Sequence, residues 1–419
     1  MATVGIIAEY NPFHNGHVLQ LCEIHRRFPH ADIIVAMSGS FTQRGSVAIL
    51  DKWQRAEAAV RHGASLVLEL PAVFATRSAQ YFASGGIRLL DRLGVVDFLA
   101  FGSECDSLTQ LRSMSEKIEA AAKSDGFKTR LRAGGSYAAA LTDAAAPDDL
   151  MRQPNVILSL EYLRALSQIN SSIEPLPLPR FSTGHHEQNL PAGDMETAVA
   201  SASAIRTALA RFSDGDEKSF AAVLRTVPDD IRDILLQAKT HRFSDQSLLF
   251  RPILSRLLTA DTSLLRSFAG ISEGLEHRLR RAALSARSCE ELIDAVRSKR
   301  YPLARVRRLL LHLLLCLSKD DAKRFDEQGP LYARVLAFND NGRRLLRKIK
   351  KHAGIPVVAK TSRFLPMRAL ESGKLSPAQK MLAFDFRGTA LASLTSTPVG
   401  FPAANADFSV SPIYLDHTI

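Results

Sequence analysis

Two histidines, His14 and His17, stand three residues apart with Gly16 between them, soon after the apolar run at residues 4–8. Two imidazoles at this spacing can donate hydrogen bonds to phosphate oxygens as negative charge builds up on them. Gly16 lets the backbone approach a phosphate closely, and a helix that begins near His17 offers unpaired N–H groups and the positive end of its dipole. The segment therefore predicts a phosphate-binding turn between a first strand and a first helix.

A second polar segment near residue 200 could hold the rest of a polyphosphate. The pattern H-x-G-H is similar to the signature of adenylyl-transferring α/β enzymes, which pair it with a distant helix start of the type S-[ST]-x-x-R. Here residues 201–206 read Ser-Ala-Ser-Ala-Ile-Arg, so a helix start would present Ser203 and Arg206 to a triphosphate. Taken alone, the segment favours a plain amphipathic helix. Beside the H-x-G-H turn, we interpret it as the other half of a nucleotide site.

The first hundred residues alternate apolar runs with helical patterns, which is typical of strands joined by crossover helices. Strands are expected at 4–9, 31–37, 66–70 and 96–101, and helices at 16–28, 52–62 and 79–93. Strands connected in this way predict an α/β fold with a Rossmann-like parallel sheet that is covered on both faces. Ligands bind such sheets at the carboxyl ends of the strands, where the polar loops 9–17, 38–45 and 102–104 converge.

Beyond residue 106 the pattern becomes mainly helical. The expected elements are helices within 106–170 with a break at Gly134 and Gly135, a last strand at 173–178, a helix within 196–211 and an amphipathic helix at 305–317. The strand signal vanishes beyond residue 214, and the last twenty residues, rich in Pro, Ser and Ala, are expected to be extended or loosely packed. We therefore expect a nucleotide-binding domain at 1–213 and a mainly helical, basic domain at 214–419.

The chain of 419 residues carries 54 Lys and Arg against 43 Asp and Glu, which gives a formal net charge of +11. The excess is uneven, because residues 299–351 hold 15 cationic and 5 acidic side chains. Such a segment indicates a polyanionic partner, nucleic acid first, although a solvated helical surface has the same composition. No apolar run is long enough to cross a bilayer, and the four cysteines lack C-x-x-C spacing. We expect a cytoplasmic protein with no membrane association, disulfide framework or zinc site.

Over nearly its whole length, the chain resembles the family of bacterial tRNA(Met) cytidine acetate ligases. The string Glu-Tyr-Asn-Pro-Phe-His-Asn-Gly-His at 9–17 is specific to that family, unlike H-x-G-H alone. Further matching segments are 37–45, 51–53 with Arg55, 69–71, 78–79, 101–104, 154–155, 161–163, 299–301 with Arg305, Arg307 and Arg308, and 334–342.

The resemblance implies that ATP activates acetate as acetyl-adenylate, and that the acetyl group then passes to N4 of the wobble cytidine of elongator tRNA(Met) to form N4-acetylcytidine. It also implies a set of ATP contacts along one segment and at three further positions. These are Ile7, Ala8, Glu9, Tyr10, Asn11, Pro12, Phe13, His14, Asn15, Gly16, His17, Val18, Leu19 and Gln20, with Gly102, Asn155 and Arg180. The residues that follow Arg180, at 182–185, depart from the more usual continuation in the family.

The chemistry of the residues agrees with this scheme, because carboxylate attack on the α-phosphorus needs alignment and charge neutralisation more than covalent help. His14 and His17 would steady the α- and β-phosphates, and Arg206, with Ser203, would hold the leaving pyrophosphate. Candidates at the acetate or tRNA end are Ser38, Gln43, Lys52 and Arg55, and candidates for binding the tRNA backbone are Lys299, Arg300, Arg305, Arg307 and Arg308. Magnesium (Mg2+) is a plausible companion of the triphosphate, yet no carboxylate cluster marks a protein-built metal site.

Two other functions stay open at the level of the sequence. An adenylyltransferase that acts on a small phosphorylated metabolite would share the H-x-G-H turn, but it has no need of a long basic helical segment. A nucleotide-regulated RNA-binding protein without catalysis would keep the basic surface. No feature of the sequence indicates the oligomeric state.

Overall fold

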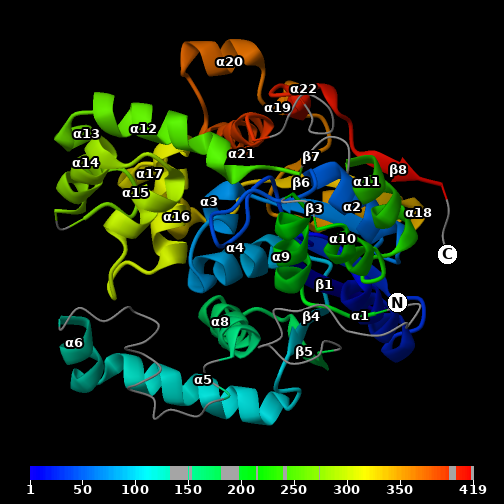
Figure 1. The fold of residues 1–419 in the computed structure, drawn as a ribbon. Helices are drawn as coiled ribbons and strands as arrows, with labels where there is room; N and C mark the ends of the chain where they lie inside the picture. Colours follow the sequence, from blue (N-terminus) through cyan, green and yellow to red (C-terminus); the bar gives the residue numbers. More distant parts are fainter. Residues whose placement is uncertain are drawn as a thin grey trace.

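The computed structural model describes residues 1–132, 150, 153–180, 198–213, 216–238, 243–272, 274–395 and 403–416. A sheet of eight strands runs through the molecule, and helices cover both of its faces (Figure 1). The expected α/β fold with a Rossmann-like sheet is thereby confirmed. The break expected at Gly134 and Gly135 and the segment 182–185 lie outside the described residues. None of the described helices is long and apolar enough to span a membrane.

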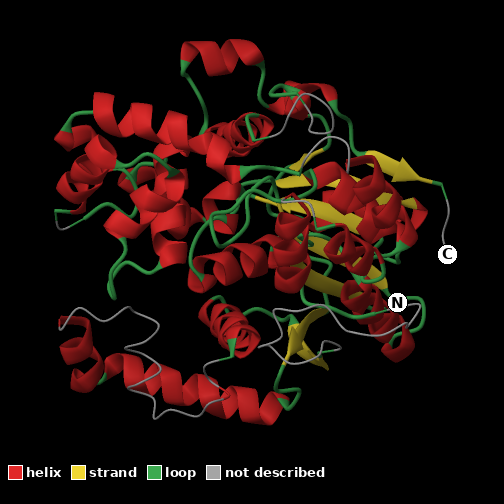
Figure 2. Cartoon of the chain, viewed as in Figure 1, coloured by secondary structure: helices red, strands yellow, loops and turns green. Residues whose placement is uncertain are grey.

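The first five strands are parallel neighbours in the order β5-β4-β1-β2-β3. They are β1 (Thr3–Ala8), β2 (Asp32–Ser38), β3 (Leu66–Leu70), β4 (Phe98–Ser103) and β5 (Glu174–Pro179), and each matches an expected strand. All residues of β2 and β3 are buried, because helices pack against both faces of the sheet (Figure 2). Their carboxyl ends lie at one edge, which is the edge that carries the polar loops.

The helices that follow these strands begin where the sequence supplies a cap. In α1 (Asn15–Arg27) the cap residue is His14, and in α2 (Lys52–Arg61) the Asp51 carboxylate accepts hydrogen bonds from the N–H groups of Trp53 and Gln54. The other helices of this half are α3 (Ala72–Ala75), α4 (Ala79–Asp91), α5 (Leu108–Lys123), α6 (Asp125–Arg132), α8 (Pro154–Gln168) and α9 (Ala202–Ser213). The sheet has a hydrophobic core on each face, and alternate residues of β2 point into one or the other. Ile33 and Val35 pack with α1 and α2 on one face, whereas Ile34 and Ala36 pack with α4 on the opposite face.

The expectation that strands vanish beyond residue 214 is wrong. Strand β6 (Ala333–Asn339) pairs antiparallel with β3, and β7 (Val357–Val358) and β8 (Ile413–Leu415) pair with β6. The apolar run of β6 is interrupted by Arg334, which is 3% exposed and is paired with Glu69 of β3. A charge that is buried needs a partner, and here the partner is far away in sequence, so local pattern does not reveal it. The division at residue 213 stays a prediction, and strands from both sides of it form one sheet.

The rest of the chain is mainly helical, as expected. Its helices are α10 (Glu217–Leu224), α11 (Asp229–Ala238), η2 (Gln246–Leu249), α12 (Phe250–Thr259), α13 (Thr262–Ser267), α14 (Leu275–Ser285), α15 (Cys289–Val296), α16 (Leu303–Leu315), α17 (Lys319–Gln328), α18 (Asp340–His352), α19 (Thr361–Phe364), α20 (Met367–Ser372), α21 (Pro377–Ser393) and α22 (Ala406–Ser409). Helices α12 to α17 gather to one side of the sheet, and α18 lies at the far side (Figure 1).

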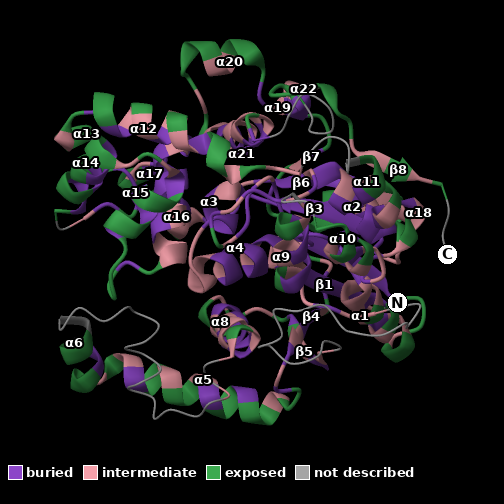
Figure 3. Ribbon diagram, in the orientation of Figure 1, coloured by how far each residue is buried: buried purple, intermediate pink, exposed green. Residues whose placement is uncertain are grey.

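The last twenty residues include an extended strand, as expected, and most of those that the structure describes are exposed, but the segment is also anchored at one buried point that the composition did not predict. Strand β8 adds to the sheet, and the Asp407 carboxylate of α22 is buried against Lys52 and Arg334 at 2.7 Å from each cation. Figure 3 shows buried residues continuing from the sheet into α22. The segment is anchored by ion pairs with residues far away in sequence, so its Pro- and Ser-rich composition did not reveal the anchor.

The basic segment 299–351 is divided between opposite edges of the sheet. At the carboxyl edge, α16 contacts the loop after β2, where Arg308 donates to the carbonyl of Gln43 at 3.4 Å. At the amino edge, α18 begins against Ser65, the residue before β3, because β6 runs antiparallel to β3. The cations of α16 and those of α18 therefore lie at opposite edges of the sheet, and Arg334, between them in sequence, is buried.

Candidate functional site

A cavity of about 510 Å³ opens at the carboxyl edge of the parallel strands. Segments that are far apart in sequence build its wall: the turn after β1, the loop after β2, the ends of β4 and β5, and the starts of α8 and α9. This is the edge at which open α/β sheets bind ligands, and the volume is typical of small-molecule sites.

Most of the residues expected at a nucleotide site line this cavity. They are Ile7, Ala8, Glu9, Tyr10, Asn11, His14, Gly16, His17, Gln20, Gln43, Gly102, Asn155, Arg180, Ser203 and Arg206. Five expected ATP contacts lie outside the lining, namely Pro12, Phe13, Asn15, Val18 and Leu19. Phe13 is fully buried in the core, and the Asn15 amide donates to the carbonyls of Ala198 and Arg225 at 2.9 and 3.0 Å, which holds the segment before α9 against the start of α1.

Sequence reasoning missed several lining residues. Those are Arg44, Ala79, Phe82, Phe101, Pro154, Leu158, Tyr162, Leu178, Pro179 and Ala202. Most are apolar and carry no chemical signature, so only the packing of α4 and α8 against the sheet reveals them. Arg44 is the exception, since it stands within the polar loop 38–45.

The two imidazoles of the H-x-G-H turn are held in one orientation by the backbone. Nδ1 of His14 accepts from the Gly16 N–H at 3.1 Å, and Nδ1 of His17 accepts from the His14 N–H at 3.2 Å. The rings stack with their centroids 3.7 Å apart. A neutral imidazole carries one proton, so an Nδ1 that accepts leaves the proton on Nε2. Each ring is thus prepared to donate one hydrogen bond from Nε2.

Both histidines are uncharged at neutral pH. Burial, and then the nearby Arg180 and Arg206 guanidinium groups, lower the pKa of His14 to about 3. Burial, followed by the neighbouring His14 and then Arg180, lowers the pKa of His17 well below its usual value. The positive charge of the cavity is therefore carried by arginines, and the imidazoles act as neutral donors.

The start of α9 presents polar groups to the cavity, as the pattern at 201–206 predicts. The Ser201 hydroxyl accepts from the Ala204 N–H at 3.1 Å and so caps the helix. Ser203 is exposed in the first turn, and Arg206 donates to the carbonyl of Asn11 at 2.7 Å. This bond ties the first turns of α9 to the turn after β1, so Ser203, Arg206 and the two histidines face one cavity.

Glu104 organises the side of the cavity that is formed by β4, β5 and α8. Its carboxylate accepts from the Asn155 amide at 2.6 Å and from the Val156 N–H at 3.1 Å, and it pairs with Arg180 at 3.5 Å. Burial lowers the pKa of Arg180, whereas the charge of Glu104 raises it. These contacts bring Asn155 and Arg180 next to Gly102, as the resemblance implies.

Three of the acetate or tRNA candidates are buried away from the cavity. Lys52 and Arg55 are fully buried, and so is Ser38. Arg55 donates to the carbonyls of Glu9 at 2.5 Å, Ser38 at 3.1 Å and Gly39, and thus ties the exits of β1 and β2 to α2. These buried side chains cannot contact a substrate in this structure. We therefore infer that Lys52 and Arg55 hold α2 and the neighbouring strands in position. Gln43 is the one candidate of the four that lines the cavity.

None of the five basic candidates of 299–308 lines the cavity. Lys299 and Arg300 are exposed, and Arg305 lies 4.6 Å from the centre of the Tyr301 ring. Burial, followed by the charges of Arg305 and Arg77, lowers the pKa of Arg308 to about 10. Arg307 and Arg308 follow in the first turns of α16, next to the loop that carries Gln43.

Cation-binding side chains do not cluster in the described part of the chain, where no group of three His, Cys, Asp or Glu residues has metal-binding geometry. The four cysteines are free thiols. Among the described residues that line the cavity, Glu9 is the only acidic one.

Comparison with known proteins identifies relatives along the full chain. The profile of the family described as HIGH Nucleotidyl Transferase matches residues 1–404. A protein of Syntrophomonas wolfei subsp. wolfei, named tRNA(Met) cytidine acetate ligase, is 35% identical over 424 residues that cover 99% of this chain and 99% of the relative. A protein of Acetivibrio thermocellus with the same name is 38% identical over 385 residues that cover 87% of this chain and 89% of the relative.

Solved structures show the same fold. The crystal structure of Thermotoga maritima TmcAL bound with alpha-thio ATP matches with a TM-score of 0.84 and 29% identity, and the apo form of that protein matches with a TM-score of 0.85. Each comparison covers 100% of both chains.

Proposed function

Because the chain belongs to the HIGH nucleotidyl transferase family, we propose that it binds ATP in the cavity and uses it to activate acetate. The acetyl group is then transferred to a cytidine of tRNA(Met), a substrate pair that the names of the relatives support. The finer parts of the proposal are that the tRNA is the elongator, that the target is N4 of the wobble cytidine, and that the reaction is cytoplasmic.

The observation that carries the proposal is the convergence of two distant motifs on one cavity. His14 and His17 come from the turn after β1, and Ser203 and Arg206 come from the start of α9. Neutral Nε2–H donors on one side and a guanidinium on the other are suited to a triphosphate. On this proposal, Gly102, Asn155 and Arg180 border the nucleoside end.

The first step is attack by an acetate oxygen on the α-phosphorus of ATP. A new P–O bond forms, the bond from the α-phosphorus to the bridging oxygen breaks, and pyrophosphate leaves. The protein contributes alignment and charge neutralisation: the histidines donate to phosphate oxygens, and Arg206 faces the departing pyrophosphate. In the second step the cytosine amine attacks the acetyl carbon, with release of AMP and a proton.

A magnesium ion is proposed to enter with the triphosphate. Glu9 is the acidic residue of the described cavity lining, and its carboxylate already accepts from the Gln43 N–H at 2.7 Å. The donor set here therefore suits an ion that is held chiefly by phosphate oxygens and water, as Mg2+ is in many nucleotide sites.

The tRNA is proposed to approach over α16. Acetyl transfer requires the target base to leave its stack, and single-stranded loops present bases in that way. In support, the first turns of α16, which carry Arg307 and Arg308, contact the turn at Gln43 and Gly45, and Gln43 lines the cavity. Contacts of the basic side chains of 299–308 with phosphates would make binding fall steeply with salt concentration.

The test is ATP–pyrophosphate exchange measured with and without acetate. We expect exchange that depends on acetate, and we expect His17→Ala to lower its rate by about 10²–10³, the usual effect of removing one preorganised donor. His25→Ala is the matched control, because His25 lies on the same helix and faces the carbonyl of Gly63 away from the cavity. The control should retain the rate of the unmodified protein.

Other results would identify the alternatives. Exchange that depends on a phosphorylated metabolite in place of acetate would identify an adenylyltransferase of small molecules. No exchange with any acceptor, together with retained tRNA binding, would identify a non-catalytic RNA-binding protein. Acetate-dependent exchange that survives His17→Ala would show that the H-x-G-H turn does not act on the phosphates.

A further inference from the structure

Arg44 is a cationic residue of the cavity lining that has no role in the reaction proposed above. Three arginines, Arg44, Arg180 and Arg206, line the described cavity. Arg180 pairs with Glu104 and Arg206 donates to Asn11, whereas Arg44 is exposed and makes no hydrogen bond or ion pair with the described residues. Its guanidinium therefore has all its donors available for a ligand.

The backbone that carries Arg44 is a tight turn fixed at several points. The Thr42 N–H donates to the Ser46 carbonyl and the Gly45 N–H to the Thr42 carbonyl, both at 2.9 Å. The neighbouring Gln43 N–H donates to Glu9 at 2.7 Å. Gly45 has a φ of +77°, a conformation that favours glycine. Arg44 thus stands at the tip of a preorganised turn.

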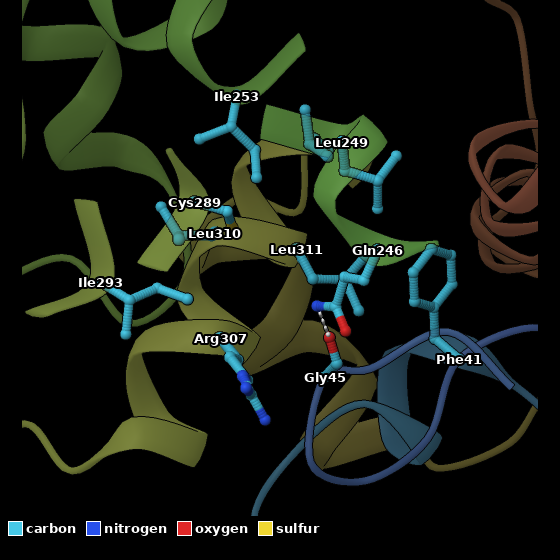
Figure 4. A pocket seen from close by; sticks show the side chains of 11 residues that line it. Phe41, Gly45, Gln246, Leu249, Ile253, Cys289, Ile293, Arg307, Leu310 and Leu311 are labelled. Carbon is cyan, nitrogen blue, oxygen red and sulfur yellow. Dashed lines mark hydrogen bonds between the residues drawn. The ribbon is translucent and has the colours of Figure 1, made fainter. Parts of the chain in front are cut away.

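This turn fills the space between the cavity and the basic helix α16. A Cβ on Gly45 would lie 2.7 Å from the backbone nitrogen of Arg308, so the turn and the helix are in direct contact. Arg308 donates to the Gln43 carbonyl, and Gln246 donates to the Gly45 carbonyl at 3.2 Å. Figure 4 shows Gln246, Gly45 and Arg307 together at this junction.

Several arginines lie close together where the turn at 42–46 meets α16. Arg44 lies near enough to Arg206 to contribute to lowering the pKa of that residue, after the larger effect of burial. On the other side of the turn, the charges of Arg305 and Arg77 contribute, after burial, to the lowered pKa of Arg308. Among the acidic groups near these arginines, Glu9 accepts from the Gln43 N–H and Asp326 pairs with Arg77. An exposed arginine in this setting is suited to an anion from solution.

We propose that Arg44 binds a phosphate of the RNA backbone beside the target nucleotide, at the mouth of the cavity. The inference rests on the proposed function. Arg44 is exposed at the rim, next to the first turns of α16, whereas the histidines expected to contact ATP are recessed, with His14 only 8% exposed. The RNA backbone that passes over α16 would be fixed by this phosphate contact at the entrance of the cavity. The contact would therefore determine which nucleotide of the RNA places its base in the cavity.

The experiment compares Arg44→Ala and Arg44→Lys in two assays of the full-length protein. Acetylation of tRNA reports the KM for tRNA, and acetate-dependent pyrophosphate exchange without tRNA reports the KM values for ATP and acetate. Arg347→Ala is the matched control, because it removes one exposed arginine from α18 at the opposite edge of the sheet.

For Arg44→Ala we expect the KM for tRNA to rise about tenfold, the usual cost of one charge-assisted hydrogen-bonded contact. In a plot of the logarithm of the affinity for tRNA against the logarithm of the salt concentration, the magnitude of the slope should decrease by about 1. Arg44→Lys should lose less affinity for tRNA than Arg44→Ala, because lysine keeps the positive charge and lacks only the planar, forked arrangement of guanidinium donors. The KM values for ATP and acetate should stay as in the unmodified protein, and Arg347→Ala should change none of these quantities.

Four results would overturn the proposal, and the first is an unchanged KM for tRNA in Arg44→Ala. A raised KM for ATP in Arg44→Ala would assign the guanidinium to the γ-phosphate, and a raised KM for acetate would assign it to the carboxylate. An equal loss of tRNA affinity in Arg347→Ala would show a general charge effect. Failure of the proposed function itself is distinct, since the unmodified protein would then lack acetate-dependent exchange.

Discussion

The buried charge network around Asp407 gives the sharpest test of how this fold is held together. The Asp407 carboxylate contacts Lys52 and Arg334 at 2.7 Å from each, and Glu69 contacts the same two cations at 2.8 Å. All four side chains are at most 4% exposed. Two cations thus balance two carboxylates, and the network joins α2, β3, β6 and α22.

Replacement of Asp407 by Ala would leave two buried cations with one carboxylate. Breaking a buried pair in this way costs about 3–5 kcal/mol, because the remaining charge has lost its partner and cannot reach water. Burial alone would raise the pKa of Asp407, but attraction by Arg334 and Lys52 outweighs it and lowers the pKa. A lowered carboxyl pKa means that this group stabilises the fold at neutral pH and that its contribution is lost only as pH falls through the folded pKa.

The assay is urea unfolding of the unmodified protein, Asp407→Ala and the control Asp416→Ala at neutral pH. Asp416 is an exposed residue of the same segment, and its removal should change the free energy of unfolding by less than about 0.5 kcal/mol. If Asp407→Ala cost less than about 1 kcal/mol, or no more than the control, the last segment would not be anchored by the network. The packing described for residues 403–416 would then be refuted.

Two further predictions concern the histidines and the amino edge of the sheet. Burial holds the pKa of His14 at about 3 and that of His17 well below normal. In an NMR pH titration of the free protein, the ring signals of these two histidines should therefore show no transition near about pH 6.5, the usual value for His; a transition there would contradict neutral donors. Gly342→Ala would bring a Cβ to 2.0 Å from the backbone oxygen of Ser65, and urea unfolding should show a loss of about 1–3 kcal/mol. Gly354→Ala, with open space around it, is the control, and equal stability of the two variants would count against the close packing of α18.

The first half of the fold was predictable because its signals are local. Strands β1 to β5 are short apolar runs, and the helices between them follow at regular intervals, so the parallel sheet and its binding edge follow from the pattern. The H-x-G-H turn could be predicted for the same reason, since the spacing of its histidines and its position after β1 both follow from one short stretch of sequence. The pairing with Ser203 and Arg206 needed the known resemblance, because residues 201–206 alone favour a plain helix.

Charge was the least reliable guide to the site. Lys52 and Arg55 were candidates for the acetate or tRNA end of the site, yet both are buried with partners from other elements. Arg44 lines the cavity but had no distinguishing feature within its loop. The basic segment 299–351 suggested one surface, and the antiparallel pairing of β6 with β3 divides it in two.

Local pattern along the chain was enough to predict the alternation of strands and helices, the H-x-G-H turn after β1 and the family, since each of these depends on neighbouring residues. Tertiary structure alone decided which charges meet: Arg334 could enter a buried strand and Asp407 could anchor the last segment because Glu69 and Lys52, hundreds of residues earlier in the chain, compensate them. The physical reason is that burying an ion requires a partner within a few ångströms, and chain order does not specify where that partner lies.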